Sequence, residues 1–249
     1  MRKVLLGEGY EDCSGLVERI AEGFAGLGEV VYDARNQIRV VETERGRWNV
    51  KRYHRPALLN RLVYSTVRRA KGLRAFVYPA RLLGAGIETP RAIAYVEERR
   101  WGLIGESFLF TEQCELSRRF YELGDARLDD CRGLVAAFVE MTVRMHEAGL
   151  LHKDYSPGNI LFDCVDGEWR FSLVDINRLR IGAVSVKKGC ENFARLWGQP
   201  EVFRFMAREY ARRRGADVEE CERWVMSARR RFWLPRMRKW KLPYRLVLE

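Results

Sequence analysis

The sequence predicts an α+β protein with two lobes, a small β-rich N-terminal lobe and a larger, mainly helical C-terminal lobe. Runs rich in Val, Ile, Tyr and Trp come early in the chain, whereas apolar residues at helical spacing come later. The 249 residues are enough for one large core or two small ones. We therefore expect the N-terminal lobe to cover residues 1–111 and the C-terminal lobe to cover residues 112–249.

The strands are expected in the N-terminal lobe. Residues 29–41 and 47–53 are rich in β-branched and aromatic side chains, and the segment 44–46 between them ends in Gly, so they are predicted to be strands joined by a turn. Residues 93–110 predict a further strand pair that turns around residues 98–100. The segment 111–115, TEQCE, is then the expected hinge between the lobes.

Helices are expected on both sides of the hinge. Residues 56–83 carry apolar side chains at helix-like spacing, with a break predicted near Gly72 and Pro79. Residues 128–149 predict a long helix, and the chain is again helical from residue 201 onward. The apolar face of the long helix comprises Leu134, Ala137, Phe138, Met141 and Met145.

The most informative motif is HKDYSPGN at residues 152–159, which is followed by Asp175 in the segment SLVDIN. Phosphoryl transfer needs a carboxylate that orients a hydroxyl nucleophile, and oxygen ligands that hold Mg²⁺ on the phosphates of ATP. Asp154 can supply the first, and Asn159 and Asp175 can supply the second. The alternative interpretation is a chance turn with Asx caps.

The spacing of these residues agrees with a shared site. Two apolar runs between Asn159 and Asp175 are separated by Asp166-Gly167, a strong signal for a β-hairpin. With the turn centred on this dipeptide, paired residues have numbers that sum to about 333, so that Asn159 faces Val174. The two oxygen ligands therefore converge at the open end of the hairpin.

The motif resembles the catalytic loop of the protein-kinase-like fold, with DIN at residues 175–177 where protein kinases carry DFG. The resemblance implies that Asp154 is the catalytic base and that His152 supports the loop. It also implies that Lys51, in the predicted strand 47–53, pairs with the nucleotide phosphates. The alternative for Lys51 alone is a solvated strand lysine.

A closer resemblance rests on five stretches of the chain. They are YDARNQIRV, NVKRY, LLGAGIETP, LLHKDYSPGNILF, and LVDINRLRIG followed by KKGCENFARL. Over roughly residues 29–200 the sequence resembles the lipopolysaccharide kinase (Kdo/WaaP) family, in its small Bacteroidetes-type form. The resemblance implies ATP- and Mg²⁺-dependent phosphorylation of a sugar, Kdo or heptose, in the inner core of lipopolysaccharide on a lipid-linked acceptor.

The predicted nucleotide site departs from the protein-kinase pattern. No GxGxxG motif occurs between the first strands, so Arg35 and Asn36 are expected to cover the phosphates, and Glu112 and Cys114 of the hinge are expected to bind the nucleotide. Relatives carry the αC glutamate where this chain has Val77. The alternative function is therefore a pseudokinase that binds nucleotide or a partner without turnover.

The net charge is +11, with a pI of about 9.6, and such a balance favours polyanionic partners. The basic residues concentrate in residues 51–81 and in the C-terminal tail, where they alternate with Phe232, Trp233, Leu234, Trp240, Leu242 and Tyr244. One interpretation is peripheral contact with an anionic inner membrane, and the other is solvated helix faces with aromatic side chains packed on the C-terminal lobe. Specific nucleic-acid binding is not expected, because charge alone supports it.

The remaining composition indicates a cytoplasmic enzyme. The six cysteines are scattered without a CxxC or Cys/His cluster, so neither a zinc site nor a disulfide framework is predicted. The apolar stretch near the N-terminus is too short for a signal peptide, and no apolar run approaches the length of a membrane span.

Overall fold

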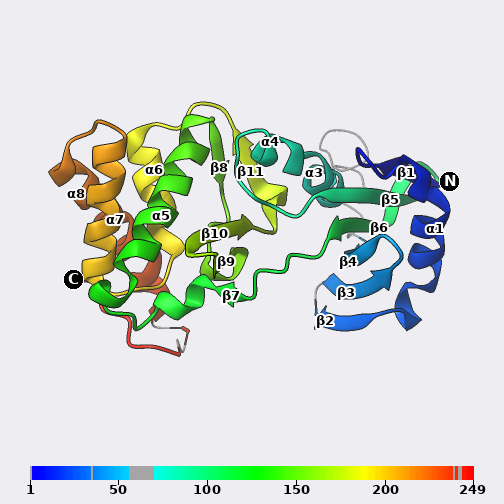
Figure 1. Cartoon of the computed structure of the whole chain (residues 1–249), viewed down its shortest axis with the longest axis horizontal. Coiled ribbons are helices and arrows are strands. Elements are labelled where there is room, and N and C mark those ends of the chain that lie inside the picture. The colour runs from blue at the N-terminus through cyan, green and yellow to red at the C-terminus, as the bar shows by residue number, and fades with distance from the viewer. Residues whose placement is uncertain (1, 35, 56–69, 238, 241–242) are drawn as a thin grey trace. The chain divides into compact units, whose positions relative to one another are not determined.

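The computed structural model describes residues 2–34, 36–55, 70–237, 239–240 and 243–249 (Figure 1). The chain divides into two compact units. Unit 1 contains residues 1–81 and 90–115, and unit 2 contains residues 82–89 and 116–249. A short segment of unit 2 therefore lies, in the sequence, between the two parts of unit 1.

Unit 1 is built on a six-stranded antiparallel sheet with the strand order β1-β5-β6-β4-β3-β2. Its strands are β1 (Arg2–Leu6), β2 (Glu29–Asp33), β3 (Asn36–Thr43), β4 (Gly46–Tyr53), β5 (Ala92–Arg100) and β6 (Leu103–Glu112). The strand predicted at residues 47–53 is confirmed as β4, whereas the predicted run 29–41 forms two paired strands, β2 and β3, and β1 was not predicted.

The turn between β5 and β6 lies further along the chain than the sequence suggested. Trp101 and Gly102 form it, with φ angles of 56° and 74°, as a two-residue hairpin turn requires. The prediction of a turn at residues 98–100 was wrong because a run of charged residues was taken for a loop. Arg99 belongs to β5, where its Nε donates a hydrogen bond of 2.6 Å to Glu97.

Helices cover both faces of this sheet. Helix α1 (Ser14–Gly23), which the sequence analysis did not predict, packs its apolar side chains against one face, in a core that includes Val17, Trp48 and Phe110. Helix α3 (Lys71–Val77) packs against the other face, where Gly72 lies so close that a Cβ atom would come within 2.6 Å of the Tyr95 ring.

The break predicted at Pro79 is confirmed, whereas the one predicted at Gly72 is wrong, because Gly72 lies inside α3. The next helix, α4 (Pro79–Leu83), begins at the proline that follows α3. Residues 56–69, with the predicted apolar positions Leu58, Leu62, Val63 and Val67, lie outside the described residues.

Unit 2 is mainly helical, with small antiparallel sheets (Figure 1). Its larger helices are α5 (Leu128–Glu147), α6 (Val186–Asn192), α7 (Pro200–Arg213) and α8 (Val218–Met237). Its strands are β7 (Arg118–Arg119), β8 (Leu150–His152), β9 (Ile160–Val165), β10 (Glu168–Leu173) and β11 (Leu179–Ile181). Helix α5 confirms the prediction for residues 128–149, and it stops before Gly149, whose φ is 72°.

The β9–β10 hairpin has the predicted register. Val165 pairs with Glu168 next to the turn and Ile160 pairs with Leu173 at the open end. Beyond the strands, Val174 N–H donates to the carbonyl oxygen of Asn159 at 3.0 Å. The Asp-Gly turn has φ angles of 52° at Asp166 and 84° at Gly167, which fit a two-residue hairpin loop.

The segment 82–89 is tied to the end of β10. Leu173 N–H donates to the carbonyl oxygen of Glu88 at 2.9 Å, and the Thr89 hydroxyl donates to the carbonyl oxygen of Leu173 at 2.7 Å. Glu88 also accepts two hydrogen bonds, of 3.0 and 2.8 Å, from the guanidinium of Arg170. These contacts brace the strand that leads to Asp175.

The C-terminal tail of the chain is folded back onto unit 2. Tyr244 is buried and lies 4.8 Å, centroid to centroid, from the ring of Trp197, and Trp233 is also buried. Leu234 and Trp240 are exposed. Leu242 lies outside the described residues. The tail thus combines packed aromatic side chains with exposed ones, and none of the described helices is long and apolar enough to cross a bilayer.

A buried arginine holds this tail in place. Arg229 of α8 has no exposed surface, and its two terminal nitrogens donate hydrogen bonds of 2.6 Å to the carbonyl oxygens of Val247 and Gly198. Its guanidinium lies 4.3 Å from the centre of the Phe203 ring. Burial lowers the pKa of Arg229 to about 10, so the side chain stays charged at neutral pH.

We predict that Arg229→Ala lowers the free energy of unfolding by about 3 kcal/mol, because the buried carbonyl oxygen of Gly198 and the partly buried one of Val247 lose their donors. Urea denaturation followed by tryptophan fluorescence measures this change. The control is Arg230→Ala, which removes an exposed ion pair with Glu249 and should cost less than about 1 kcal/mol. Equal losses in the two variants would contradict the proposed role of Arg229.

Candidate active site

The imidazole of His152 joins the two halves of the candidate site. It has no exposed surface, and its Nδ1 accepts a hydrogen bond of 3.1 Å from Asp154 N–H. Since Nδ1 is an acceptor, Nε2 carries the proton and donates to the carbonyl oxygen of Val174 at 3.0 Å. Burial lowers the pKa of His152, although the Val174 hydrogen bond opposes this, so the ring is neutral.

The loop after His152 is closed by hydrogen bonds to one carbonyl oxygen. The backbone carbonyl of Asp154 accepts from Ser156 N–H and from the Asn159 side-chain nitrogen Nδ2, each at 2.8 Å. Because Nδ2 is used in this way, Asn159 has its side-chain oxygen left to serve as a ligand. The loop thus fixes the orientation of Asn159 relative to Asp154.

Tyr155 anchors the same loop in the core of unit 2. Its ring is 1% exposed and stacks on Phe138 of α5 at a centroid distance of 5.6 Å. Its hydroxyl oxygen lies 2.7 Å from the hydroxyl of Thr142, also on α5. Asp154 is therefore flanked by two buried side chains, His152 and Tyr155, which limit its movement.

Asp175 follows directly after Val174 and has a left-handed backbone, with φ 53° and ψ 43°. Asp tolerates this conformation better than most residues. Its Oδ1 accepts a hydrogen bond of 2.6 Å from the side-chain nitrogen of Asn177, which is buried. Asn177, at the place of the DFG glycine, therefore holds the carboxylate of Asp175 in one orientation.

Two arginines, which the sequence analysis did not single out, contact the carboxylate of Asp154. Arg195, in the 3₁₀ turn Phe193–Arg195, forms an ion pair with Oδ1, and Arg178 lies 3.9 Å from Oδ2. The Asp154 side chain is 27% exposed. Both arginines lie in stretches that carry the family resemblance, but nothing in the sequence places Arg195 beside a residue 41 positions away.

The predicted nucleotide-binding residues that the structure describes lie in unit 1. Lys51 pairs with Ile38 of β3 and Leu109 of β6, and its Nζ lies 5.4 Å from the centre of the Tyr53 ring. The carbonyl oxygen of Asn36 accepts from Ala34 N–H at 3.1 Å. Arg35 lies outside the described residues.

The two hinge residues predicted to bind nucleotide also have contacts within unit 1. The Glu112 carboxylate accepts a hydrogen bond of 2.7 Å from the Tyr10 hydroxyl. The Cys114 carbonyl oxygen accepts one of 3.0 Å from the Gln113 side chain. Asp154, Asn159 and Asp175 belong to unit 2, so their meeting with these residues in one cleft stays a prediction.

Val77, which the family resemblance aligns with the αC glutamate, is the last residue of α3. Glu88, the first acidic residue after Val77 in the sequence, is paired with Arg170 in unit 2. A different acid, Glu97 of β5, is buried in unit 1 and accepts hydrogen bonds of 2.6 Å from the Tyr95 hydroxyl and from Arg99. The strand register puts Glu97 on the same face of the sheet as Lys51.

The oxygen ligands suit Mg²⁺. Among the described residues no group of three or more His, Cys, Asp or Glu side chains could hold a metal ion. Mg²⁺ is often bound by only one or two protein side chains, with water and substrate phosphates completing its octahedral shell. The amide oxygen of Asn159 and the carboxylate of Asp175 are oxygen donors of the kind that such a site uses.

Comparisons with known proteins identify the family and the fold of the chain. The sequence model of the lipopolysaccharide kinase (Kdo/WaaP) family matches residues 27–214. No curated protein matches the chain. A solved structure, WaaP in complex with acyl carrier protein, is similar with a TM-score of 0.61 and 20% sequence identity, covering 94% of this chain and 97% of that chain. This likeness confirms the predicted α+β, kinase-like fold.

We predict that His152→Phe lowers the free energy of unfolding by about 1–3 kcal/mol at neutral pH, since Asp154 N–H and the Val174 carbonyl lose their partner. The pKa of His152 lies below its usual 6.5 in the folded protein, so below that pH the unfolded chain binds more protons.

The wild-type protein should therefore lose stability as the pH falls below about 6.5, by up to about 1.4 kcal/mol per pH unit from this residue. The His152→Phe variant should lack this pH-dependent loss of stability. Urea denaturation of both proteins at a series of pH values measures the difference, and parallel curves would contradict the neutral, buried state of His152.

Proposed function

Since the chain belongs to the lipopolysaccharide kinase (Kdo/WaaP) family, we propose that it is a sugar kinase that uses ATP and Mg²⁺ to phosphorylate a hydroxyl of Kdo or heptose in the inner core of lipopolysaccharide. The observation that carries the proposal is the network around His152. It holds a carboxylate, an amide and a second carboxylate, those of Asp154, Asn159 and Asp175, on segments joined by short hydrogen bonds.

Asp154 is the proposed catalytic base. Its carboxylate accepts a hydrogen bond from the sugar hydroxyl and orients the oxygen toward the γ-phosphorus of ATP. As the new O–P bond forms, the bond from the γ-phosphorus to the bridging oxygen of ADP breaks, and the hydroxyl proton passes to Asp154. His152 keeps the carboxylate in place through the Asp154 N–H, so positioning is a large part of its effect.

Asn159 and Asp175 would hold Mg²⁺. The ion, when bound, neutralises charge on the transferred phosphoryl group. Asn159 contributes an amide oxygen whose orientation the Asp154 carbonyl fixes, and Asp175 contributes a carboxylate that Asn177 orients. Both side chains are thus prepared before the nucleotide arrives, which reduces the ordering cost at the moment of reaction.

The nucleotide is the proposed ligand of Lys51, Arg35, Asn36, Glu112 and Cys114 in unit 1. Lys51 would pair with the phosphates, and the hinge residues would bind the base. Glu97, as a buried acid on the same sheet face, supports a role for a β5 residue in place of the αC glutamate.

The second candidate function is a pseudokinase that binds nucleotide or a partner without turnover. Two features favour it: the family resemblance aligns Val77 with the αC glutamate, and Arg195 forms an ion pair with the carboxylate of Asp154. A thermal shift with Mg-ATP, together with no transfer to any sugar acceptor, would support this function over the kinase.

The acceptor is lipid-linked in the proposed reaction, and we place the enzyme in the cytoplasm, in peripheral contact with the anionic inner membrane. Leu234 and Trp240 support this proposal, because both are exposed in a tail rich in arginine. Aromatic and apolar side chains enter the headgroup region of a bilayer while cations contact the phosphates. Flotation with anionic vesicles tests the contact.

We predict that Asp154→Asn and Asp175→Asn each lower phosphate transfer from labelled ATP to a Kdo-lipid acceptor by at least about a hundredfold. The control is Asp129→Asn, which changes an exposed aspartate in the first turn of α5 and should leave the rate unchanged. Circular dichroism checks that all variants are folded. Retained activity in both site variants would refute the assignment, and mass spectrometry of the product locates the phosphate.

A further inference from the structure

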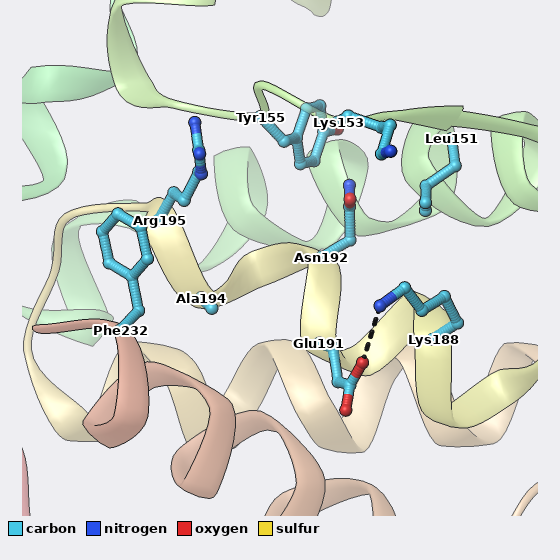
Figure 2. Close-up of a pocket in the computed structure, with 9 residues that line it drawn as sticks. All are labelled: Leu151, Lys153, Tyr155, Lys188, Glu191, Asn192, Ala194, Arg195 and Phe232. Atoms are coloured by element: carbon cyan, nitrogen blue, oxygen red, sulfur yellow. Dashed lines mark hydrogen bonds and ion pairs between the residues drawn. The ribbon is translucent and has the colours of Figure 1, made fainter. Parts of the chain in front are cut away.

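A basic cavity lies beside Asp154 in unit 2, and the proposed transfer leaves it without a role (Figure 2). Its volume is about 190 Å³. The residues that line it are Leu151, Lys153, Tyr155, Lys188, Glu191, Asn192, Ala194, Arg195 and Phe232. Asp154 itself does not line the cavity, but Lys153 and Tyr155 adjoin it in the sequence and Arg195, which lines the cavity, pairs with its carboxylate.

Positive charge dominates the cavity. Lys153, Lys188 and Arg195 line it, and Glu191 is the single acid among its lining residues. A neighbouring hollow of about 300 Å³ shares Lys188 and Glu191, and it adds Arg231 and Arg236. Glu191 is tied to Lys188 at 3.0 Å and to Arg231 at 3.3 Å, so it does not cancel the remaining cations.

The electrostatics of Glu191 reflect this excess of positive charge. Burial alone would raise the pKa of its carboxyl, but the Lys188 hydrogen bond and the charges of Lys188 and Arg231 lower it. The basic side chains that stabilise the Glu191 carboxylate will also attract a second anion. The cavity is therefore suited to bind a carboxylate or a phosphate group.

The side chain of Asn192 adds a further hydrogen-bond donor to the cavity. Asn192 points toward Tyr155 and Lys153 (Figure 2), and its Nδ2 is buried without a hydrogen-bond partner among the described residues. A buried donor without an acceptor costs free energy, which a bound oxygen would recover. Leu151 and Phe232 supply apolar walls, as in most pockets that bind small molecules.

Arg195 links this cavity to the carboxylate of Asp154. Its guanidinium lines the cavity and at the same time forms the ion pair with Oδ1 of Asp154. While this pair persists, Oδ1 of Asp154 is occupied by Arg195 and is a poorer acceptor for a sugar hydroxyl. An oxyanion in the cavity competes for the guanidinium, which binds carboxylates and phosphates through two parallel hydrogen bonds.

We propose that the basic cavity binds an anionic group of the acceptor, a carboxylate or a phosphate, and that this group draws Arg195 away from Asp154 and so frees the base for the hydroxyl. The proposal rests on the proposed kinase function. It makes Arg195 a positioning residue that couples acceptor binding to the readiness of Asp154. Neutral sugars and water lack the anion, so they leave the base paired.

Binding of small sugars tests the cavity without turnover. Ligand-observed NMR titrations, without nucleotide and at constant ionic strength, compare free Kdo, glucose 1-phosphate and glucose. Both anionic sugars should bind and glucose should not, and the tighter of the two identifies the group that the cavity accepts. Lys188→Ala should weaken anion binding by about tenfold, because it removes a charged donor from the cavity.

The matched control is Lys187→Ala. Lys187 is the exposed neighbour of Lys188 on α6 and does not line the cavity, so its loss should leave anion binding as in the wild-type protein. Equal affinity for glucose and the anionic sugars, or equal affinities of the Lys187 and Lys188 variants, would overturn the proposed cavity function.

Kinetics test the role of Arg195. Arg195→Ala should raise the KM for a Kdo-lipid acceptor while the KM for ATP stays unchanged. It should also raise ATP hydrolysis in the absence of acceptor severalfold above that of the wild-type and Lys187→Ala proteins, because Asp154 loses its partner. Hydrolysis equal to that of the wild type would overturn the release of Asp154.

The two proposals fail in different ways. If the wild-type protein binds anionic sugars but transfers no phosphate, the kinase function fails and the cavity remains an anion site. If it transfers phosphate at the same KM in the Lys188 and Lys187 variants, the kinase function stands and the cavity proposal fails.

Discussion

The neutral imidazole of His152 is the interaction on which the candidate site depends. One ring nitrogen accepts from the backbone of Asp154 and the other donates to the backbone of Val174, next to Asp175. A charged ring could not make both bonds, and burial keeps it neutral. The loop that carries Asp154 and the segment that carries Asp175 are therefore held together by a single side chain, so the geometry of the candidate site depends on the burial of one histidine.

Around this histidine the site is assembled largely from neighbours in the sequence. The backbone carbonyl of Asp154 accepts hydrogen bonds from Ser156 and Asn159. The β9–β10 hairpin then brings the chain back beside Asn159. The two arginines on Asp154 add a different kind of contact, because they pair with its carboxylate from later parts of the sequence. Arg195 also lines the basic cavity, so in the proposed function an anion bound there acts on the ion pair with Asp154.

The parts of this protein that follow from local physics could be predicted from the sequence. The Asp166-Gly167 turn set the hairpin register, and the 3.6-residue period of residues 128–149 located α5. Long-range contacts could not be predicted in this way. The ion pair of Arg195 joins residues 41 positions apart, and α1 packs on a sheet that is completed much later in the chain. The turn at Trp101 was misplaced because charged strand residues resemble loop residues when their partners are unknown.

The segment 82–89 constrains how the chain folds while it is being synthesised. The polypeptide passes between the two units three times, between residues 81 and 82, 89 and 90, and 115 and 116. Thr89 leaves the ribosome 84 residues before Leu173, whose backbone it must meet. The nascent chain therefore has to keep this segment accessible while unit 1 is forming, and the C-terminal unit cannot be obtained as one continuous fragment without losing the partners of Leu173.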